Sequence, residues 1–212
     1  MPQVLKDAVR RRIQHAALEV FAAQGYAGAT MTAIATRAHV APANLYRYYP
    51  SKQALFDAVL PAEIAERFAS LLEAGVRSLA HVAVAPAPPG AEAASAELLR
   101  FWIEHRLAVV ILLDRAVGTP YAAYSTQFVE QLVTLTLAQL RAGHPGVRVS
   151  EAARRVLVQV FENTRRTLAA LLQECPSERA IVEAIQAFRS YQIAGLWGLV
   201  RWIVEAGAVP AP

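Results

Sequence analysis

The sequence predicts an all-α protein in which an N-terminal three-helix domain of the helix-turn-helix type precedes a larger C-terminal helical bundle. Helix-forming residues (Ala, Leu, Glu, Gln and Arg) are abundant, and no segment alternates apolar and polar residues with period two. Ser, Thr, Pro and Gly also stand at the spacings that start and end helices. With 55% hydrophobic and 18% charged residues among 212, the chain has ample material for a packed core.

The first 52 residues predict three short helices. The first ends at Gly25, because glycine readily takes the backbone conformation that closes a helix, and it carries one apolar stripe: Ile13, Ala17, Val20 and Phe21. Thr30 is the expected N-cap of the second helix, which runs to about Ala38. Pro42 suits the first turn of the third helix, and Pro50 ends it.

A tight turn at residues 39–41 joins the second and third helices, which is the layout of a helix-turn-helix. One set of side chains has the spacing to close a small core: Ile34, Ala35, Ala38, Val40 and Leu45. Another set is left facing outward: Thr32, Arg37, Asn44, Arg47 and Tyr48.

The rest of the chain is also predicted to be helical. We expect a helix capped by Ser51 over 52–79, a proline-rich irregular connection over 82–95, and helices over 96–115, near Tyr121 and over 125–142. Two long helices follow, from the N-cap Ser150 to about 174 and from the N-cap Ser177 to about 206. We place the domain boundary at 52, so that residues 1–52 and 53–212 are separate units.

Charge is concentrated at the N-terminus. Up to residue 52 there are seven cations and two anions, a net charge of +5, whereas the remaining fourteen cations and fifteen anions sum to −1. This favours a polyanion as partner of the first domain only, with a solvated basic face as the alternative. The same two interpretations, an arm beside DNA or a solvated face, stay open for Arg10, Arg11 and Arg12.

Three parts of residues 16–60 form a recognisable pattern: AALEVFAAQGY, Thr30 with Ile34 and Ala35, and above all LYRYYPSKQALF. Through them this segment resembles the N-terminal DNA-binding domain of the TetR family of bacterial transcriptional regulators. The resemblance implies phosphate contacts for Thr30, Tyr46, Tyr48 and Lys52, and base-edge contacts for Pro42, Ala43 and Asn44 at the start of the recognition helix. Asn44 is the best candidate for reading sequence, because its amide can pair with both N6 and N7 of adenine.

Three residues depart from the family's pattern. His39 stands where glycine is usual in the turn, Ala41 replaces the usual Ser or Thr cap of the third helix, and Tyr49 stands where phenylalanine is common. Histidine tolerates a positive φ better than most residues, and a missing cap costs about 1 kcal/mol. We expect small changes in how the third helix is positioned and no change of fold.

The C-terminal domain is expected to bind an effector and to dimerise, as the resemblance implies. Its aromatic and neighbouring residues are candidates to line a site for a mostly apolar molecule: Trp102, His105, Val109, Tyr121, Tyr124, Phe128, Phe161 and Thr164. Ordinary core packing is the alternative, especially for His105. The last two long helices carry apolar stripes suited to a homodimer interface or to intrachain packing: Val156, Val160, Leu168 and Leu172 on one, and Ile181, Ile185, Phe188, Leu196, Leu199 and Ile203 on the other, with Gly195 and Gly198 beside them.

Other classes of function find little support. The single cysteine, Cys175, has no histidine near it in sequence, the five histidines lack metal-ligand spacing, and there is no phosphate-binding glycine loop, so we expect no enzyme activity, metal or cofactor. Mean hydropathy is +0.29, but the uncharged runs 78–91 and 116–129 are shorter than the roughly 18 residues of a spanning helix. We expect a cytoplasmic protein without a signal peptide or membrane association.

These observations predict a homodimeric repressor that binds a palindromic double-stranded DNA operator and is released by a small, mostly apolar effector. An effector-independent or activating DNA-binding protein of the same fold is the alternative. A helical enzyme that carries a basic module is a further one.

Overall fold

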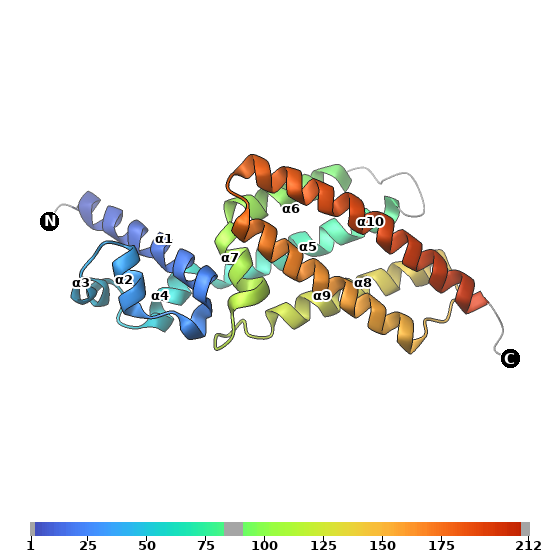
Figure 1. Ribbon diagram of the computed structural model, residues 1–212, viewed down its shortest axis with the longest axis horizontal. Helices are drawn as coiled ribbons and strands as arrows, with labels where there is room; N and C mark the ends of the chain where they lie inside the picture. Colours follow the sequence, from blue (N-terminus) through green and yellow to red (C-terminus); the bar gives the residue numbers. More distant parts are fainter. Residues whose placement is uncertain (1–2, 83–90, 209–212) are drawn as a thin grey trace.

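The computed structural model describes residues 3–82 and 91–208, and all regular structure in this part of the chain is helical (Figure 1). A small unit at one end holds the first four helices: α1 (Gln3–Gly28), α2 (Met31–Arg37), α3 (Pro42–Tyr48) and α4 (Lys52–Val59). The larger unit holds α5 (Ala62–Val82), α6 (Ala91–Glu104), α7 (Arg106–Val110), the π-helical turn η1 (Ile111–Arg115), α8 (Tyr124–Gly143), α9 (Glu151–Glu174) and α10 (Glu178–Ala208). The predicted all-α class is confirmed.

The expected N-caps are confirmed by hydrogen bonds. The hydroxyl of Thr30 accepts from the Ala33 N–H at 3.1 Å, and that of Ser51 accepts from the Ala54 N–H at 3.0 Å. Ser150 and Ser177 cap α9 and α10 in the same way, with N···O distances of 3.1 and 3.2 Å. Each serine or threonine thereby satisfies one backbone donor that the helix itself leaves unpaired.

Two residues of the small unit have the positive φ that their positions require. Gly25, with φ +71°, ends the regular part of α1, and only a short turn continues to Gly28. His39 has φ +52° in the turn between α2 and α3, and it is the one non-glycine residue with positive φ in the described part of the chain. Histidine is among the side chains that tolerate this conformation, so the turn forms without the usual glycine.

Several predicted elements differ from the structure. The helix expected over 52–79 is two helices, because Pro61 disfavours helical backbone at Leu60, whose φ and ψ are −134° and 68°. The helix expected near Tyr121 is a series of turns held by the Thr119 hydroxyl, which accepts from the Tyr121 N–H at 3.0 Å. Residues 91–95, expected to be irregular, begin α6, while 83–90 of the same predicted connection lie outside the described residues.

The helix expected over 96–115 also forms in pieces. It is divided at His105, whose φ and ψ of −109° and 28° are not helical, and it ends in η1. The helices predicted over 125–142 and for the last two long segments agree with α8, α9 and α10 to within a few residues.

Aromatic side chains centre both cores. Phe21 of α1 and Phe56 of α4 meet edge to face at 5.4 Å, and Tyr26 packs on both rings. This cluster fastens α4 to the small unit. In the larger unit, Phe68 of α5 stacks on Phe101 at 5.9 Å and contacts two rings of α8.

The two units meet where η1 packs against the end of α1. A buried cation, Arg165 of α9, holds η1 in place: its guanidinium donates to the Leu113 carbonyl at 2.6 Å and to the Asp114 carboxylate at 2.8 Å, and it also pairs with Glu162 at 3.0 Å. Burial would lower the pKa of Arg165, but the hydrogen bonds to the two carboxylates outweigh it and the pKa is raised. Arg165 therefore stays charged and satisfies a π-turn carbonyl that has few helical partners.

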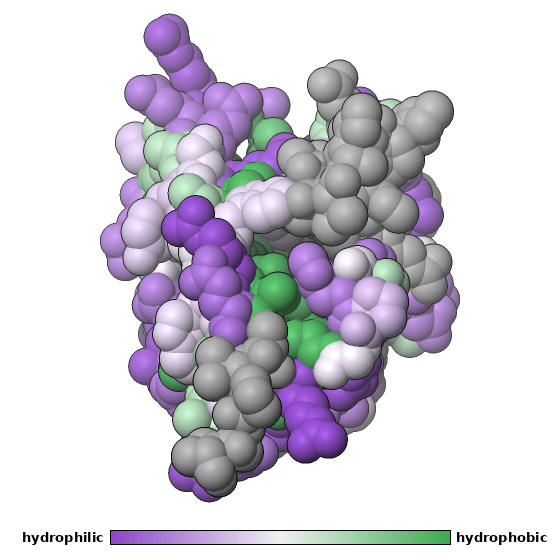
Figure 2. All heavy atoms as spheres, turned by 90° about the vertical axis from the view of Figure 1, so that its right-hand side faces the viewer, coloured by the Kyte–Doolittle hydropathy of each residue, from purple (hydrophilic) through white to green (hydrophobic). Residues whose placement is uncertain are grey.

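The opposite end of the larger unit carries exposed apolar side chains. Seen from the C-terminal end of α10, hydrophobic residues gather in a hollow between more polar ridges (Figure 2). Within the described residues, none of the helices combines the length and the hydropathy needed to span a membrane.

Candidate nucleic-acid interface

Helix α3 lies almost wholly on the surface. Of its seven residues only Leu45 is buried, with no exposed area, and it anchors the helix to the core of the small unit. Tyr48 is half-buried, and the remaining predicted contact residues of α3 are exposed: Pro42, Ala43, Asn44, Tyr46 and Arg47. A helix held by one buried side chain presents its other faces for insertion into a groove.

The start of α3 lacks the side-chain cap found at the neighbouring helices. Ala41 has no side chain that could accept a hydrogen bond, and Pro42 occupies the first turn, where its missing N–H leaves no donor unpaired. The missing side-chain cap that the sequence predicts at Ala41 is therefore confirmed. Pro42 offsets part of its cost, because it removes one backbone donor that would otherwise need a partner.

Helix α2 lies beside α3 and offers two threonines. Thr30 is exposed, although its hydroxyl oxygen already accepts from Ala33 as the N-cap. Thr32 is exposed as well, and its carbonyl accepts from the Thr36 hydroxyl at 3.0 Å. Both side chains lie on the outside of the small unit, as predicted.

Arg37, which the sequence predicts to face outward, is exposed but already forms an ion pair within the small unit. Its guanidinium forms two hydrogen bonds of 2.7 Å with the carboxylate of Glu19 on α1. The bond to Arg37 is the main reason why the pKa of Glu19 is lowered, with burial opposing it and His15 adding to it. This pair ties the end of α2 to α1.

Lys52 has a structural role that the sequence did not reveal. Its ammonium donates to the carbonyls of Tyr26 at 2.7 Å and Ala29 at 2.9 Å, and it lies 4.4 Å from the centre of the Tyr26 ring. Lys52 thus closes the C-terminal end of α1 from the start of α4. Two of its three donors are used in this way, which leaves one for a phosphate.

Tyr49, directly after α3, belongs to the core, with only 8% of its surface exposed. Burial raises the pKa of Tyr49, while a hydrogen bond from Gln14 and the charge of Arg10 oppose the rise. The end of α3 is therefore in contact with the N-terminal half of α1.

Residues 13–59 match the sequence model of the bacterial regulatory proteins of the tetR family. The N-terminal domain is therefore of the tetR-family type. The match ends at Val59, the last residue of α4, and so includes the helix that Phe56 fastens to α1. The match supports a DNA-binding transcription regulator of the helix-turn-helix type.

Three solved structures are similar to the chain at 19% identity. A putative tetR-family transcription regulator from Shewanella sp. PV-4 covers 95% of this chain and 99% of its own, with a TM-score of 0.39. A tetR-family transcriptional regulator from Streptomyces coelicolor covers 94% and 89%, with a TM-score of 0.43. NalD of Pseudomonas aeruginosa, described as the secondary repressor of the MexAB-OprM multidrug efflux pump, covers 85% and 96%, with a TM-score of 0.37. No curated protein matches the sequence.

The structure brings only some of the predicted effector residues together. Tyr124 and Phe128 of α8 pack on Phe68, a residue that the sequence did not single out, and the Tyr124 hydroxyl donates to the Ala65 carbonyl at 3.2 Å. Burial raises the pKa of Tyr124. The ring of His105 lies 4.6 Å from that of Phe101 in the same cluster.

The other candidates lie in different surroundings. Tyr121 packs on Phe56 at 6.3 Å and so lies at the junction of the two units. Thr164 of α9 bonds to the Val160 carbonyl at 2.9 Å and accepts from Gln192 of α10. Val109 and Phe161 are buried core residues, whereas Trp102 is half-buried.

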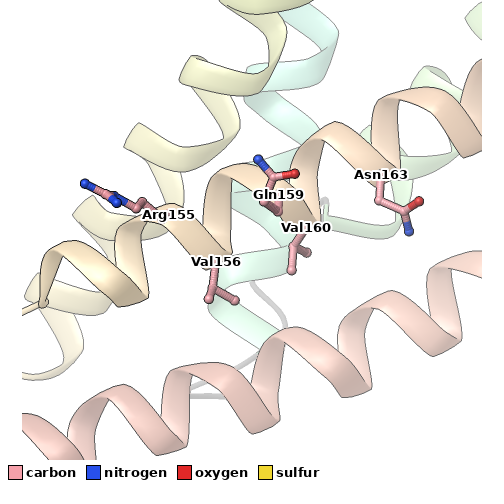
Figure 3. Close-up of a pocket in the computed structure, with 5 residues that line it drawn as sticks. All are labelled: Arg155, Val156, Gln159, Val160 and Asn163. Atoms are coloured by element: carbon pink, nitrogen blue, oxygen red, sulfur yellow. The ribbon is translucent and has the colours of Figure 1, made fainter.

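One surface groove is lined by none of these residues, although Thr164 bonds to the Val160 carbonyl at its edge. Its volume is about 390 Å³ and it follows α9, where Val156 and Val160 project on the side of α10 (Figure 3). Arg155, Gln159 and Asn163 complete the lining. The groove contains Val156 and Val160, the first half of the α9 stripe for which the sequence leaves a dimer contact and intrachain packing open, whereas Leu168 and Leu172 of that stripe are buried within the chain.

Proposed function

We propose that the chain is a homodimeric repressor that binds a palindromic operator and is released by a small, mostly apolar effector. The observation that carries its DNA-reading part is the exposure of α3, in which every residue but Leu45 and Tyr48 is open to a partner. Two such helices, about 34–36 Å apart in a dimer, enter successive major grooves.

Asn44 tests how sequence is read. Its exposed amide can form the bidentate pair with adenine, so Asn44→Ala relaxes the preference at one base pair in each half-site, by about 1–3 kcal/mol. Tyr46→Phe is the matched control in the same helix, because loss of a phosphate contact weakens binding to all sequences alike. An unchanged base preference in Asn44→Ala would remove Asn44 from the reading role.

The dimer is supported by apolar side chains that intrachain packing leaves exposed. Val156 of α9 is 47% exposed, and Tyr191 and Trp202 of α10 are 71% and 54% exposed. A Cβ added at Gly195 or Gly198 would meet no other atom within 4 Å, so α10 has room for the close approach of a second helix there.

Sedimentation tests this interface. We expect the wild type to sediment as a dimer, and Trp202→Arg to shift it towards monomer. Val117→Arg is the control, because Val117 is 68% exposed and lies outside α9 and α10. A wild-type monomer, or a dimer that Trp202→Arg leaves intact, would contradict this part of the proposal.

The effector site is supported by a buried polar atom. The indole N–H of Trp102 is shielded from solvent and has no hydrogen-bond partner in the described part of the chain. An apolar molecule with one acceptor would satisfy it, as a buried donor without a partner is costly. Thermal shifts of the wild type and Trp102→Phe across a panel of such molecules test this. A hit that stabilises both proteins equally would exclude the indole as a contact.

The route from effector to DNA would run through η1. This turn follows α7 in the chain and packs against the end of α1, and Arg165 of α9 bonds to its Leu113 carbonyl. An effector weakens DNA binding only by the difference between its affinities for two arrangements of this junction. An effector-independent or activating regulator is the second candidate. It would be favoured if every ligand that shifts the melting temperature leaves operator binding unchanged.

A further inference from the structure

The connection between α8 and α9 carries a second concentration of positive charge. Residues 141–155 hold four arginines and one glutamate, a net charge of +3. Residues 53–140 hold five cations and nine anions, a net charge of −4, and residues 156–212 hold five of each. The connection lies at the end of the molecule opposite the small unit (Figure 1). Its charge is therefore separate from that of the basic first domain and stands in a unit that is otherwise acidic or neutral.

Three of these four arginines have no partner in the chain. Arg155 forms an ion pair with Glu151 at 3.3 Å, which leaves Arg141, Arg148 and Arg154. All three are exposed, and within the described ranges, 3–82 and 91–208, none of them forms a hydrogen bond or an ion pair. Together they form a distal patch.

The loop that carries Arg148 is anchored to the core. The Val147 N–H donates to the His144 carbonyl at 3.2 Å, and Gly146 has a φ of +89° inside this turn. Val147 and Val149 are half-buried and pack against the core, whereas Arg148 between them is exposed. Two apolar neighbours thus fix the backbone from which Arg148 projects.

Helix stability accounts for only one of the three arginines. Arg141 lies in the last turn of α8, where a cation is favourable beside the negative end of the helix dipole. Arg154 is the fourth residue of α9, near the positive end of that helix, where a cation is unfavourable. Arg148 lies in neither helix. Arg148 and Arg154 therefore have no stabilising role that the fold of the chain would explain.

The distal patch is too far from α3 to assist its binding. Helix α9 leads from the patch to the small unit, where the Gln173 amide donates to the Ala22 carbonyl of α1 at 3.5 Å. The helix rises by about 28 Å from Arg154 to Gln173, at roughly 1.5 Å per residue. Exposed charges are screened over about 8 Å at physiological salt. The patch therefore fits a partner other than DNA held by α3.

The distal patch also points away from the groove on α9. Arg154 and Val156 are two residues apart and so differ by about 200° around the helix. Val156 projects on the side of α10 (Figure 3), and Arg154 therefore lies on the other side of α9, towards the end of α8 with Arg141. The patch stays open when a second copy covers the groove.

We propose that the distal patch docks an acidic segment of another protein, rich in Asp and Glu. Arginine is suited to carboxylates because its planar guanidinium can form two parallel hydrogen bonds with one of them. An acidic segment at this end is also beyond the screened field of a duplex held by α3, which would repel it. This docking is independent of the proposed DNA binding.

Nucleic acid fits the distal patch less well. The connection holds no exposed helix like α3 that could enter a groove, because the residues between α8 and α9 form a turn and a short irregular segment. Residues 141–155 also contain no Phe, Tyr or Trp on which an unpaired base could stack.

Fluorescence anisotropy of a labelled peptide of alternating Glu and Gly tests the proposal. The full chain is first saturated with a duplex of random sequence, which covers the cations of the small unit. Each exposed arginine–carboxylate pair changes Kd by about 2- to 5-fold, so we expect Arg141→Ala/Arg148→Ala/Arg154→Ala to bind the peptide at least about tenfold more weakly. The affinity of this variant for the duplex should equal that of the wild type.

The matched control removes three exposed arginines from other parts of the larger unit: Arg100 of α6, and Arg179 and Arg189 of α10. Both triple variants have the same net charge, so a loss of peptide affinity confined to the distal variant locates the docking surface. Circular dichroism verifies that both variants are folded.

Equal losses in the two triple variants would mean a response to net charge and would overturn the proposal. A wild type without affinity for the peptide, or a peptide that the duplex displaces, would overturn it as well. If the wild type binds a second duplex that the distal variant loses, the patch binds nucleic acid and the docking of an acidic protein is wrong. A failure of the proposed DNA binding appears separately, as a wild type that does not bind the duplex.

Discussion

Replacing Lys52 with methionine separates a structural role from a DNA-contacting one. The ammonium donates to two carbonyls at the end of α1, at 2.7 and 2.9 Å, and lies over the Tyr26 ring. A hydrogen bond to a charged group contributes about 1.5–3 kcal/mol, and a cation–π contact at a solvated site about 0.5–1 kcal/mol. Because Lys52 is half-exposed, water can hydrogen-bond to the two carbonyls when the ammonium is removed, which reduces the loss. We therefore expect Lys52→Met to lower the free energy of unfolding by about 2–4 kcal/mol.

Urea unfolding followed by far-UV circular dichroism measures this loss. With an m-value of about 2 kcal/mol/M, the midpoint falls by about 1–2 M. The three tryptophans, Trp102, Trp197 and Trp202, all lie in the larger unit, so their fluorescence shows whether that unit unfolds separately.

Arg154→Met is the control, because it removes an exposed cation from α9 and should leave the midpoint unchanged. A Lys52→Met protein with wild-type stability and weakened DNA binding would refute the structural role. Lowered stability together with a weaker dependence of DNA affinity on salt concentration would show that the third donor of Lys52 reaches a phosphate.

Four further changes have expected outcomes. His39→Gly removes a side chain from a residue with φ +52°, and we expect a urea midpoint that rises by the equivalent of about 0.5–1 kcal/mol; a lower midpoint would contradict strain at this turn. Ala41→Ser supplies the missing cap of α3 and should stabilise the small unit by about 1 kcal/mol in the same assay, unless Pro42 already compensates fully. Arg165→Met leaves a buried carbonyl and two carboxylates, each about one-third exposed, without their cation, so we expect the free energy of unfolding to fall by about 1–3 kcal/mol. Amide hydrogen exchange should speed up in η1 relative to the wild type, and by more than it does in α5. The pKa of Glu19 is lowered, chiefly by its bond to Arg37, so this pair stabilises the fold above the ordinary value of 4.5, and the effect is lost as the pH falls through the lower folded value. The difference in free energy of unfolding between wild type and Arg37→Ala should therefore shrink as the pH falls below 4.5, and a difference that stays unchanged on acidification would contradict this account.

The local signals in the sequence were sufficient for the helix-turn-helix unit. Thr30, Ser51 and the turn at His39 act on backbone groups within a few residues of themselves, so their effects could be predicted from spacing alone. Pro61 carried the same kind of signal, and the division of the predicted 52–79 helix follows from it. The helix predicted near Tyr121 is wrong because Thr119 holds the chain in turns there.

The features that the sequence did not reveal depend on residues far apart in the chain. Lys52 bonds to carbonyls 23 and 26 residues away, and Arg165 to a carbonyl 52 residues away. The π-turn at η1 forms where both α9 and α1 pack against residues 111–115. The spacing of apolar residues along this segment does not predict that packing. Phe68 is central to the larger core for the same reason, since its three ring partners come from two other helices.

Selection of bound sequences from a random duplex pool, at about 150 mM salt, tests the central claim most directly, because non-specific phosphate binding is weakened there. The exposed α3 and the proposed dimer predict enrichment of a palindrome whose half-sites are about one helical turn apart, or a multiple of it. Enrichment that is lost in Asn44→Ala at one position per half-site would support the reading role of that residue. No enriched sequence, with binding that falls steadily as salt rises, would contradict sequence-specific recognition and leave the basic end of the molecule as a general polyanion-binding surface.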